Sequence, residues 1–128
     1  THLIIEDNLN RKNGKFVKDQ RFSRKDSEIV SLELAKQKFL NEFVNNIDIL
    51  VGHGLSSDFK TLRVNGIDLK KNYFDTSIIG AILTQNINMV SLAFLLDYYN
   101  VSHLDLHNAA NDAEATLKVF FEMGKLKK

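Results

Sequence analysis

One β-forming run that ends in a glycine-containing break constrains the fold of this chain more than any other feature. Residues Ile47–Val51 (IDILV) are apolar and rich in β-branched side chains, which is typical of a buried strand. Gly52-His53-Gly54 interrupts the run, as happens where a strand turns into a helix. A short helix that carries Phe59, Leu62 and Val64 is expected to follow. This order predicts an α/β domain, with Ser56 or Ser57 capping the helix and Asn65-Gly66 ending it.

The first part of the chain is predicted to hold one more strand and a long helix. His2–Glu6 is a short apolar run that is expected to form the strand. Asp26 or Ser27 is expected to cap the helix, which has Glu28 in its first turn and continues to about Val44. Its apolar side is expected to comprise Ile29, Leu32, Ala35, Phe39 and Phe43.

The last part of the chain contains two clearer helices. Ser91 is expected to cap the first, with Leu92, Leu95, Leu96 and Tyr99 on one side. The second is expected to begin near Ala109 and to have an apolar face made of Ala113, Leu117, Phe120 and Phe121. Ahead of these two helices in the sequence, the run Ile78–Leu83 fits either a helix or a strand. Since no repeat or linker is evident, the 128 residues predict a single domain over residues 1–128, with few strands for its helices.

The positive charge of the chain is uneven, although the formal net charge is only +1. Cations gather in one early segment, which contains Arg11, Lys12, Lys15, Lys18, Arg21, Arg24 and Lys25. Such a segment is either a solvated loop or a strip that follows a phosphate backbone. In the second case, Lys15, Lys18 and Arg21 contribute to salt-dependent binding of nucleic acid.

Composition excludes several other classes of protein. Cysteine is absent, which excludes disulfides and thiolate metal sites and fits an intracellular setting, nuclear or cytoplasmic. No apolar run approaches the roughly 20 residues of a membrane span, so no membrane association is expected.

Asp58 is the first candidate for a chemical role. It falls in the first turn of a predicted helix at the C-terminal end of a strand, where α/β sheets bind ligands. A carboxylate in a first turn also complements the helix dipole, so this position alone leaves a structural role open.

The second candidate is the segment from His107 to Ala113 (HNAANDA). Asp112 is expected in the first turn of the last helix, whose N-terminus keeps a carboxylate ionised as a hard oxygen ligand. His107 precedes that helix, and a histidine titrates near neutral pH, as a general base requires. A helix cap beside a surface histidine is the structural alternative.

Taken together, the segments resemble the second and third motifs of the DEDDh, DnaQ-like 3′→5′ exonucleases. The resemblance covers roughly residues 27–123 and rests on V-G-H-x-x-x-x-D-F, Phe74-Asp75-Thr76, Ser91-Leu92 and H-x-x-x-x-D-A, in that order. The start of the chain is similar to a fungal subfamily linked to DEAD-box-protein activity and messenger RNA export. The resemblance implies a ribonuclease-H-like mixed sheet flanked by helices.

The resemblance also implies roles for individual residues. Asp58 and Asp112 would bind two Mg²⁺ or Mn²⁺ ions, and His107 would deprotonate the attacking water. Leu55 and Phe59 would wall the terminal nucleotide of single-stranded RNA or DNA, with core packing as the alternative for Phe59. A protein partner in RNA metabolism would follow from the same family.

The sequence departs from this family at its first motif, an Asp-x-Glu pair on the first, central strand. Asp26-Ser27-Glu28 has the spacing but is expected to open a helix, where the two carboxylates do not share a face. Glu6 and Asp7 are adjacent and would face opposite sides of a strand. We therefore expect an N-terminally truncated domain that lacks the first central strand, with a two-ion site short of ligands and little activity of its own.

Two hypotheses for function follow. The first is a metal-dependent 3′→5′ exonuclease domain that hydrolyses phosphodiesters of single-stranded nucleic acid. The second is a catalytically inactive exonuclease-like module that binds RNA or a protein.

Overall fold

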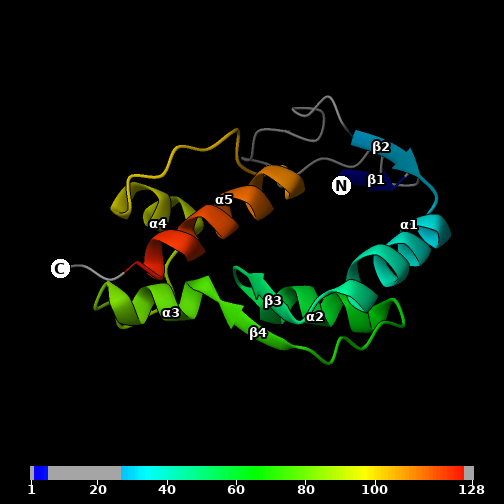
Figure 1. Cartoon of the computed structure of the whole chain (residues 1–128), viewed down its shortest axis with the longest axis horizontal. Coiled ribbons are helices and arrows are strands. Elements are labelled where there is room, and N and C mark those ends of the chain that lie inside the picture. Colours follow the sequence, from blue (N-terminus) through cyan, green and yellow to red (C-terminus); the bar gives the residue numbers. More distant parts are fainter. Residues whose placement is uncertain (1, 6–26, 126–128) are drawn as a thin grey trace. The chain divides into compact units, whose positions relative to one another are not determined.

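The computed structural model describes residues 2–5 and 27–125, and its contacts divide the chain into two compact units. The first unit comprises Thr1–Ile47 and Leu104–Asp112, and the second comprises Asp48–His103 and Ala113–Lys128. Within these described residues, each unit contains one pair of strands (Figure 1). That the chain forms a single domain remains a prediction.

The first unit pairs strand β1 (His2–Ile5) in parallel with strand β2 (Ser27–Val30). Helix α1 (Leu32–Lys38) follows and continues into a π-helical turn, η2 (Phe39–Phe43), and a 3-10 turn, η3 (Val44–Asn46). The predicted strand at the start of the chain is thus confirmed, and the long helix begins later than expected.

The expected cap of that helix at Asp26 or Ser27 is wrong for the described residues. Ser27 and Glu28 lie on β2, and Ser31 caps α1 by accepting a hydrogen bond from the Leu34 N–H at 3.2 Å. Asp26 lies outside the described residues. The reason is that Ser-Glu-Ile-Val, which ends in two β-branched residues, pairs with β1, whereas Ser31 stands directly before the helical sequence.

The second unit opens with a strand–helix–strand element. Strand β3 (Ile49–Gly52) pairs in parallel with strand β4 (Asn72–Asp75), and helix α2 (Leu55–Val64) connects them. The cap of α2 is Gly54, and the expectation of Ser56 or Ser57 is wrong. Gly54 has φ of +68°, a left-handed conformation that glycine adopts without steric cost, so the helix begins at once after the break.

Helices α3 and α4 and the greater part of helix α5, from Ala113 onward, complete the second unit. Helix α3 (Thr76–Leu83) settles the ambiguous run as helical, and helix α4 (Leu92–Tyr98) is capped as predicted by Ser91, which accepts from the Phe94 N–H at 3.1 Å. A side-chain carbon on Gly80 of α3 would lie 2.8 Å from the methyl groups of the fully buried Leu95, so α3 and α4 pack closely there. Helix α5 spans Ala109–Met123.

The face that α5 buries differs from the predicted one. Ala115, Thr116 and Val119 are buried, whereas the expected Ala113, Leu117 and Phe121 are exposed. Phe120 is half-buried, and its ring meets that of Phe74 on β4 edge-on, with centroids 4.8 Å apart. The side chains that α5 buries are thus smaller than the exposed Leu117 and Phe121.

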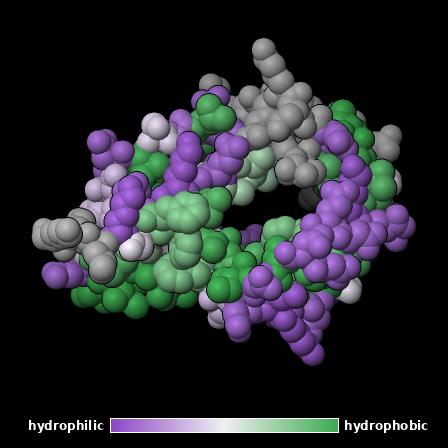
Figure 2. Space-filling view, viewed as in Figure 1, coloured by the Kyte–Doolittle hydropathy of each residue, from purple (hydrophilic) through white to green (hydrophobic). Residues whose placement is uncertain are grey.

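This α/β architecture, with short parallel strand pairs and helices, confirms the predicted class and is consistent with a ribonuclease-H-like fold. Pairing in the described residues is parallel throughout. Figure 2 shows apolar side chains gathered over α3, where Ile78, Ile82 and Leu83 are exposed. Across residues 2–5 and 27–125, no helix has the length and apolar character needed to span a membrane.

Candidate functional site

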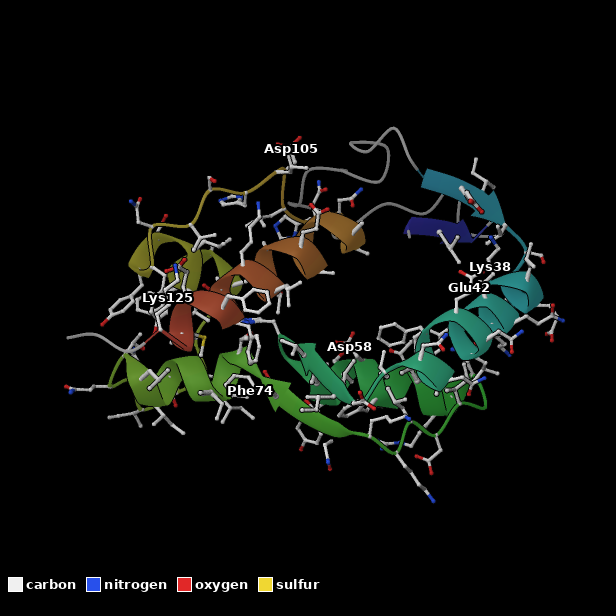
Figure 3. The ribbon with its side chains drawn as sticks, in the orientation of Figure 1. Lys38, Glu42, Asp58, Phe74, Asp105 and Lys125 are labelled. Carbon is white, nitrogen blue, oxygen red and sulfur yellow. The ribbon has the colours of Figure 1, made fainter. Side chains whose placement is uncertain are left out.

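Asp58 lies in the first turn of α2, just beyond the point where β3 ends (Figure 3). The register pairs Gly52 with Asp75, so both parallel strands end at the same level. The two helices α2 and α3 therefore begin at the carboxyl edge of the strand pair, the edge where α/β sheets bind ligands.

The carboxylate of Asp75 joins the beginnings of these two helices. Its Oδ1 accepts hydrogen bonds from the Gly54 N–H at 3.0 Å, the Ser77 N–H at 3.0 Å and the Ser77 hydroxyl at 2.7 Å. Its Oδ2 accepts from the Leu55 N–H at 2.9 Å. Asp75 thus caps α3 and also satisfies two backbone donors at the start of α2, which otherwise lack partners.

These bonds determine the charge of the site. Burial alone raises the pKa of the Asp75 carboxyl, but the bonds from Ser77, Leu55 and Gly54 outweigh it and hold this pKa below its ordinary value of 3.8. For Asp58 the direction is opposite: partial burial raises the pKa of its carboxyl above 3.8, and the charge on Asp75 raises it further. At the carboxyl edge of the strand pair, Asp75 is therefore ionised more readily than a free aspartate, and Asp58 less readily.

A second link connects the two strand ends. The Thr76 hydroxyl donates to the Gly52 carbonyl oxygen at 3.1 Å and lies 2.9 Å from Nδ1 of His53. When the Thr76 hydroxyl donates its one proton to Gly52, Nδ1 of His53 is the donor in the second bond. The two bonds tie the break after β3 to the start of α3.

The second candidate segment is organised around the start of α5. Asn108 is buried and acts as the N-cap, because its Oδ1 accepts from the N–H groups of Ala110 and Asn111 at 3.1 and 3.2 Å. Asp112 reaches back, and its Oδ1 accepts from the His107 N–H at 3.0 Å. His107 has φ of +66°, an uncommon conformation for a residue with a side chain. Asp112 thus holds the backbone of His107 directly.

Comparison with known proteins identifies the family. A family model described as DNA polymerase III subunit epsilon-like, C-terminal domain, of the DEDDh class, matches residues 1–123. The chain belongs to this DEDDh family. An uncharacterized nucleolar protein of Schizosaccharomyces pombe, C2C4.08, is 33% identical in an alignment 134 residues long, which covers 95% of this chain and 55% of that protein. The chain therefore spans about half the length of this curated relative. No solved structure matches.

Membership of the DEDDh family confirms the predicted resemblance and identifies a nuclease-like domain, consistent with a fungal DEDDh-like group. The family generally uses divalent metal ions. Of the residues carried over from its motifs, Asp58 belongs to the second unit, and His107 and Asp112 belong to the first. The convergence of all three on one centre remains a prediction. Within the described part of each unit, no three histidine, aspartate or glutamate side chains gather as a metal cluster.

The other predicted DEDDh site residues fall in different settings. Leu55 is buried and lies against Gly52, and the ring of Phe59 packs edge-on against Tyr73 with centroids 5.3 Å apart. Both therefore contribute to packing, and their contact with a nucleotide remains a prediction. Lys15, Lys18 and Arg21 lie outside the described residues.

Sequence reasoning assigned no role to Asp75, Asn108 or the His53–Thr76 pair. A signal for the two caps was present, since Asp75 stands before Thr-Ser and Asn108 stands before Ala-Ala, both of which are helix-start patterns. The bonds from Asp75 to α2 left no local signal, because they depend on the register of two strands.

Proposed function

We propose that this chain contributes the second and third motifs of a metal-dependent 3′→5′ exonuclease domain that acts on single-stranded RNA or DNA. In this proposal Asp58 and Asp112 are metal ligands and His107 is the general base. The DEDDh family supports the reaction class. The bond from the His107 N–H to the Asp112 carboxylate carries the proposal, because it couples the two residues that the third motif requires.

The residues of the chain fit a divalent cation at Asp58. The pKa of this carboxyl is raised by partial burial and by the charge on Asp75. In the described part of the chain, no Lys, Arg or His forms an ion pair with Asp58. Carboxylate oxygens are the ligands that Mg²⁺ and Mn²⁺ prefer. When bound, such ions would lower the pKa of water and stabilise the leaving oxygen of a phosphodiester.

The side chains of the chain would perform three tasks. Asp58 and Asp112 would supply negative charge and hard oxygen ligands. His107 would take the proton from the attacking water, and its strained backbone supports a functional position, because such conformations concentrate at active sites. Phe59 and Leu55 would border the terminal nucleotide.

A nuclease assay on the full-length gene product tests this function. We expect trimming from the 3′ end of a single-stranded oligonucleotide that requires Mg²⁺ or Mn²⁺. His107→Ala should lower the rate about a hundredfold, because a positioned general base contributes that much or more. His103→Ala, a change at an exposed histidine ahead of the same helix, is the matched control and should retain activity. Binding of RNA without cleavage would instead support an inactive binding module.

The basic segment gives a second expected result. Charge reversal of Lys15, Lys18 and Arg21 to glutamate should weaken binding to single-stranded nucleic acid and flatten its dependence on salt, because fewer counterions are released. Removal of three contacts changes the slope of log affinity against log salt by about two units. Fluorescence anisotropy at several salt concentrations measures this slope, with reversal of Lys60, Lys70 and Lys71 as the control. An unchanged slope would exclude the segment from the interface.

We also propose a nuclear location. It is supported by the nucleolar relative in Schizosaccharomyces pombe. Fluorescence microscopy of the tagged full-length protein tests it, and cytoplasmic fluorescence alone would contradict it.

A further inference from the structure

Two helices start side by side at the carboxyl edge of β3 and β4, and one buried side chain is bonded to both starts. Asp75 is 6% exposed, and both of its oxygens are engaged by the backbone or side chain of α2 and α3 residues. It caps α3, as many aspartates do. Its bonds to Gly54 and Leu55 have no part in that cap and require another explanation.

We infer that Asp75 is a positioning residue for the proposed nuclease centre: its carboxylate fixes the start of α2 through Gly54 and Leu55 and thereby places Asp58. The inference rests on the proposed role of Asp58 as a metal ligand. Asp58 lies within the first turn from Leu55, so a displacement of the helix start moves its carboxylate by a similar amount. The link from Thr76 to Gly52 and His53 holds the preceding break from the same side.

The hydrogen-bond pattern distinguishes positioning from metal binding by Asp75 itself. Four donors already surround its two oxygens. The pattern also requires a carboxylate. An asparagine presents one oxygen and one NH₂ group. The NH₂ group would face either the donors of Gly54 and Ser77 or the N–H of Leu55, and it cannot accept their hydrogen bonds. Asp75→Asn should therefore release the start of α2 with almost no change in side-chain size.

The experiment compares variants of the full-length protein by Mn²⁺ titration calorimetry and by hydrogen exchange of the segment that contains Gly54 and Leu55. Asp75→Asn should weaken Mn²⁺ binding about tenfold, as loss of a group that orients a metal ligand does, and should speed exchange in that segment. Ser77→Ala is the matched control. It removes one bond to the same carboxylate, keeps both bonds to α2, and should leave Mn²⁺ binding and exchange nearly unchanged.

Gly54→Ala provides a second route if Asp75→Asn does not fold. A methyl group at Gly54 meets no neighbouring atom, but the left-handed φ is strained for alanine, so the start of α2 should shift without loss of Asp75. Mn²⁺ binding should weaken here too. Mn²⁺ affinity that stays at the wild-type level in Asp75→Asn and Gly54→Ala, but is lost in Asp58→Ala, would overturn the positioning role alone. A wild-type protein that binds no Mn²⁺ would overturn the proposed function as well.

Discussion

Asp75→Ala is expected to lower the free energy of unfolding by about 3–4 kcal/mol, because it leaves three backbone N–H groups at the starts of two helices without their acceptor. Each such buried donor costs about 1–3 kcal/mol, and water reaches some of them. The melting temperature should fall by more than about 10 °C. Chemical denaturation and calorimetry measure both quantities. Asp68→Ala is the control, since Asp68 is exposed and its pairing with Lys70 at 3.7 Å should contribute less than about 0.5 kcal/mol.

The effect of Asp75 should depend on pH in a defined direction. Its pKa in the folded protein lies below the ordinary value of 3.8, so its contribution to stability is present above pH 3.8 and is lost as the pH falls through the lower folded value. The difference in melting temperature between wild type and Asp75→Ala should therefore be constant near neutrality and shrink in acid. A difference that grows below pH 4 would contradict this origin.

Asp58→Asn is expected to remove the proposed exonuclease activity, with a loss on the order of a thousandfold, while slightly stabilising the fold. The activity falls because a metal ligand loses its charge. The stability rises because the carboxylate is unfavourable where it stands: partial burial and the charge on Asp75 raise its pKa. A group with a raised pKa stabilises the fold most at low pH and loses this contribution as the pH rises through the folded value. At neutral pH the neutral amide should therefore raise the melting temperature only slightly, because Asp58 is exposed and solvent screens the effect.

Thermal unfolding with and without metal separates these two effects. Mn²⁺ at a hundred times its dissociation constant should stabilise the wild-type protein by about 2.7 kcal/mol and should leave Asp58→Asn unchanged. Asp97→Asn, at an exposed residue on α4, is the control for loss of one negative charge and should respond to Mn²⁺ like the wild type. A variant at Asp58 that is less stable than the wild type at neutral pH, or that keeps its activity, would show that this carboxylate has a structural task.

Local signals predicted those parts of the fold that depend on neighbours in the sequence. The strand before Gly52, the cap at Ser91 and the place of Asp58 in a first turn were all readable, because each depends on a few adjacent residues. Strand β2 was not, since Ser-Glu-Ile-Val becomes a strand only by pairing with β1, which is distant in the sequence. The buried face of α5 also depends on its neighbours, which select Ala115 and Val119 over the larger Leu117 and Phe121.

In the candidate site too, the sequence predicts what depends on adjacent residues and does not predict what depends on the folded backbone. The motif spacing singles out Asp58, His107 and Asp112 as candidates, and the DEDDh family model covers the part of the chain that contains them. The reach of Asp112 back to the His107 N–H was not predicted, because the left-handed backbone of His107 is invisible in the sequence. Asp75 is part of the Phe74-Asp75-Thr76 motif, but its bonds to the start of α2 arise from a strand register that places Gly52 beside it.

The backbone N–H groups at the start of α2 are already bound to an anion of the protein itself. Successive N–H groups at a glycine-led helix start form a concave cradle that many nucleotide-binding proteins use for phosphate. Here the cradle made by Gly54 and Leu55 is filled by the carboxylate of Asp75. A phosphate that arrives at this edge would meet negative charge in place of free amides. Cations must therefore balance the charge of the phosphate. Binding of nucleic acid at this edge thus requires cations and depends on their concentration.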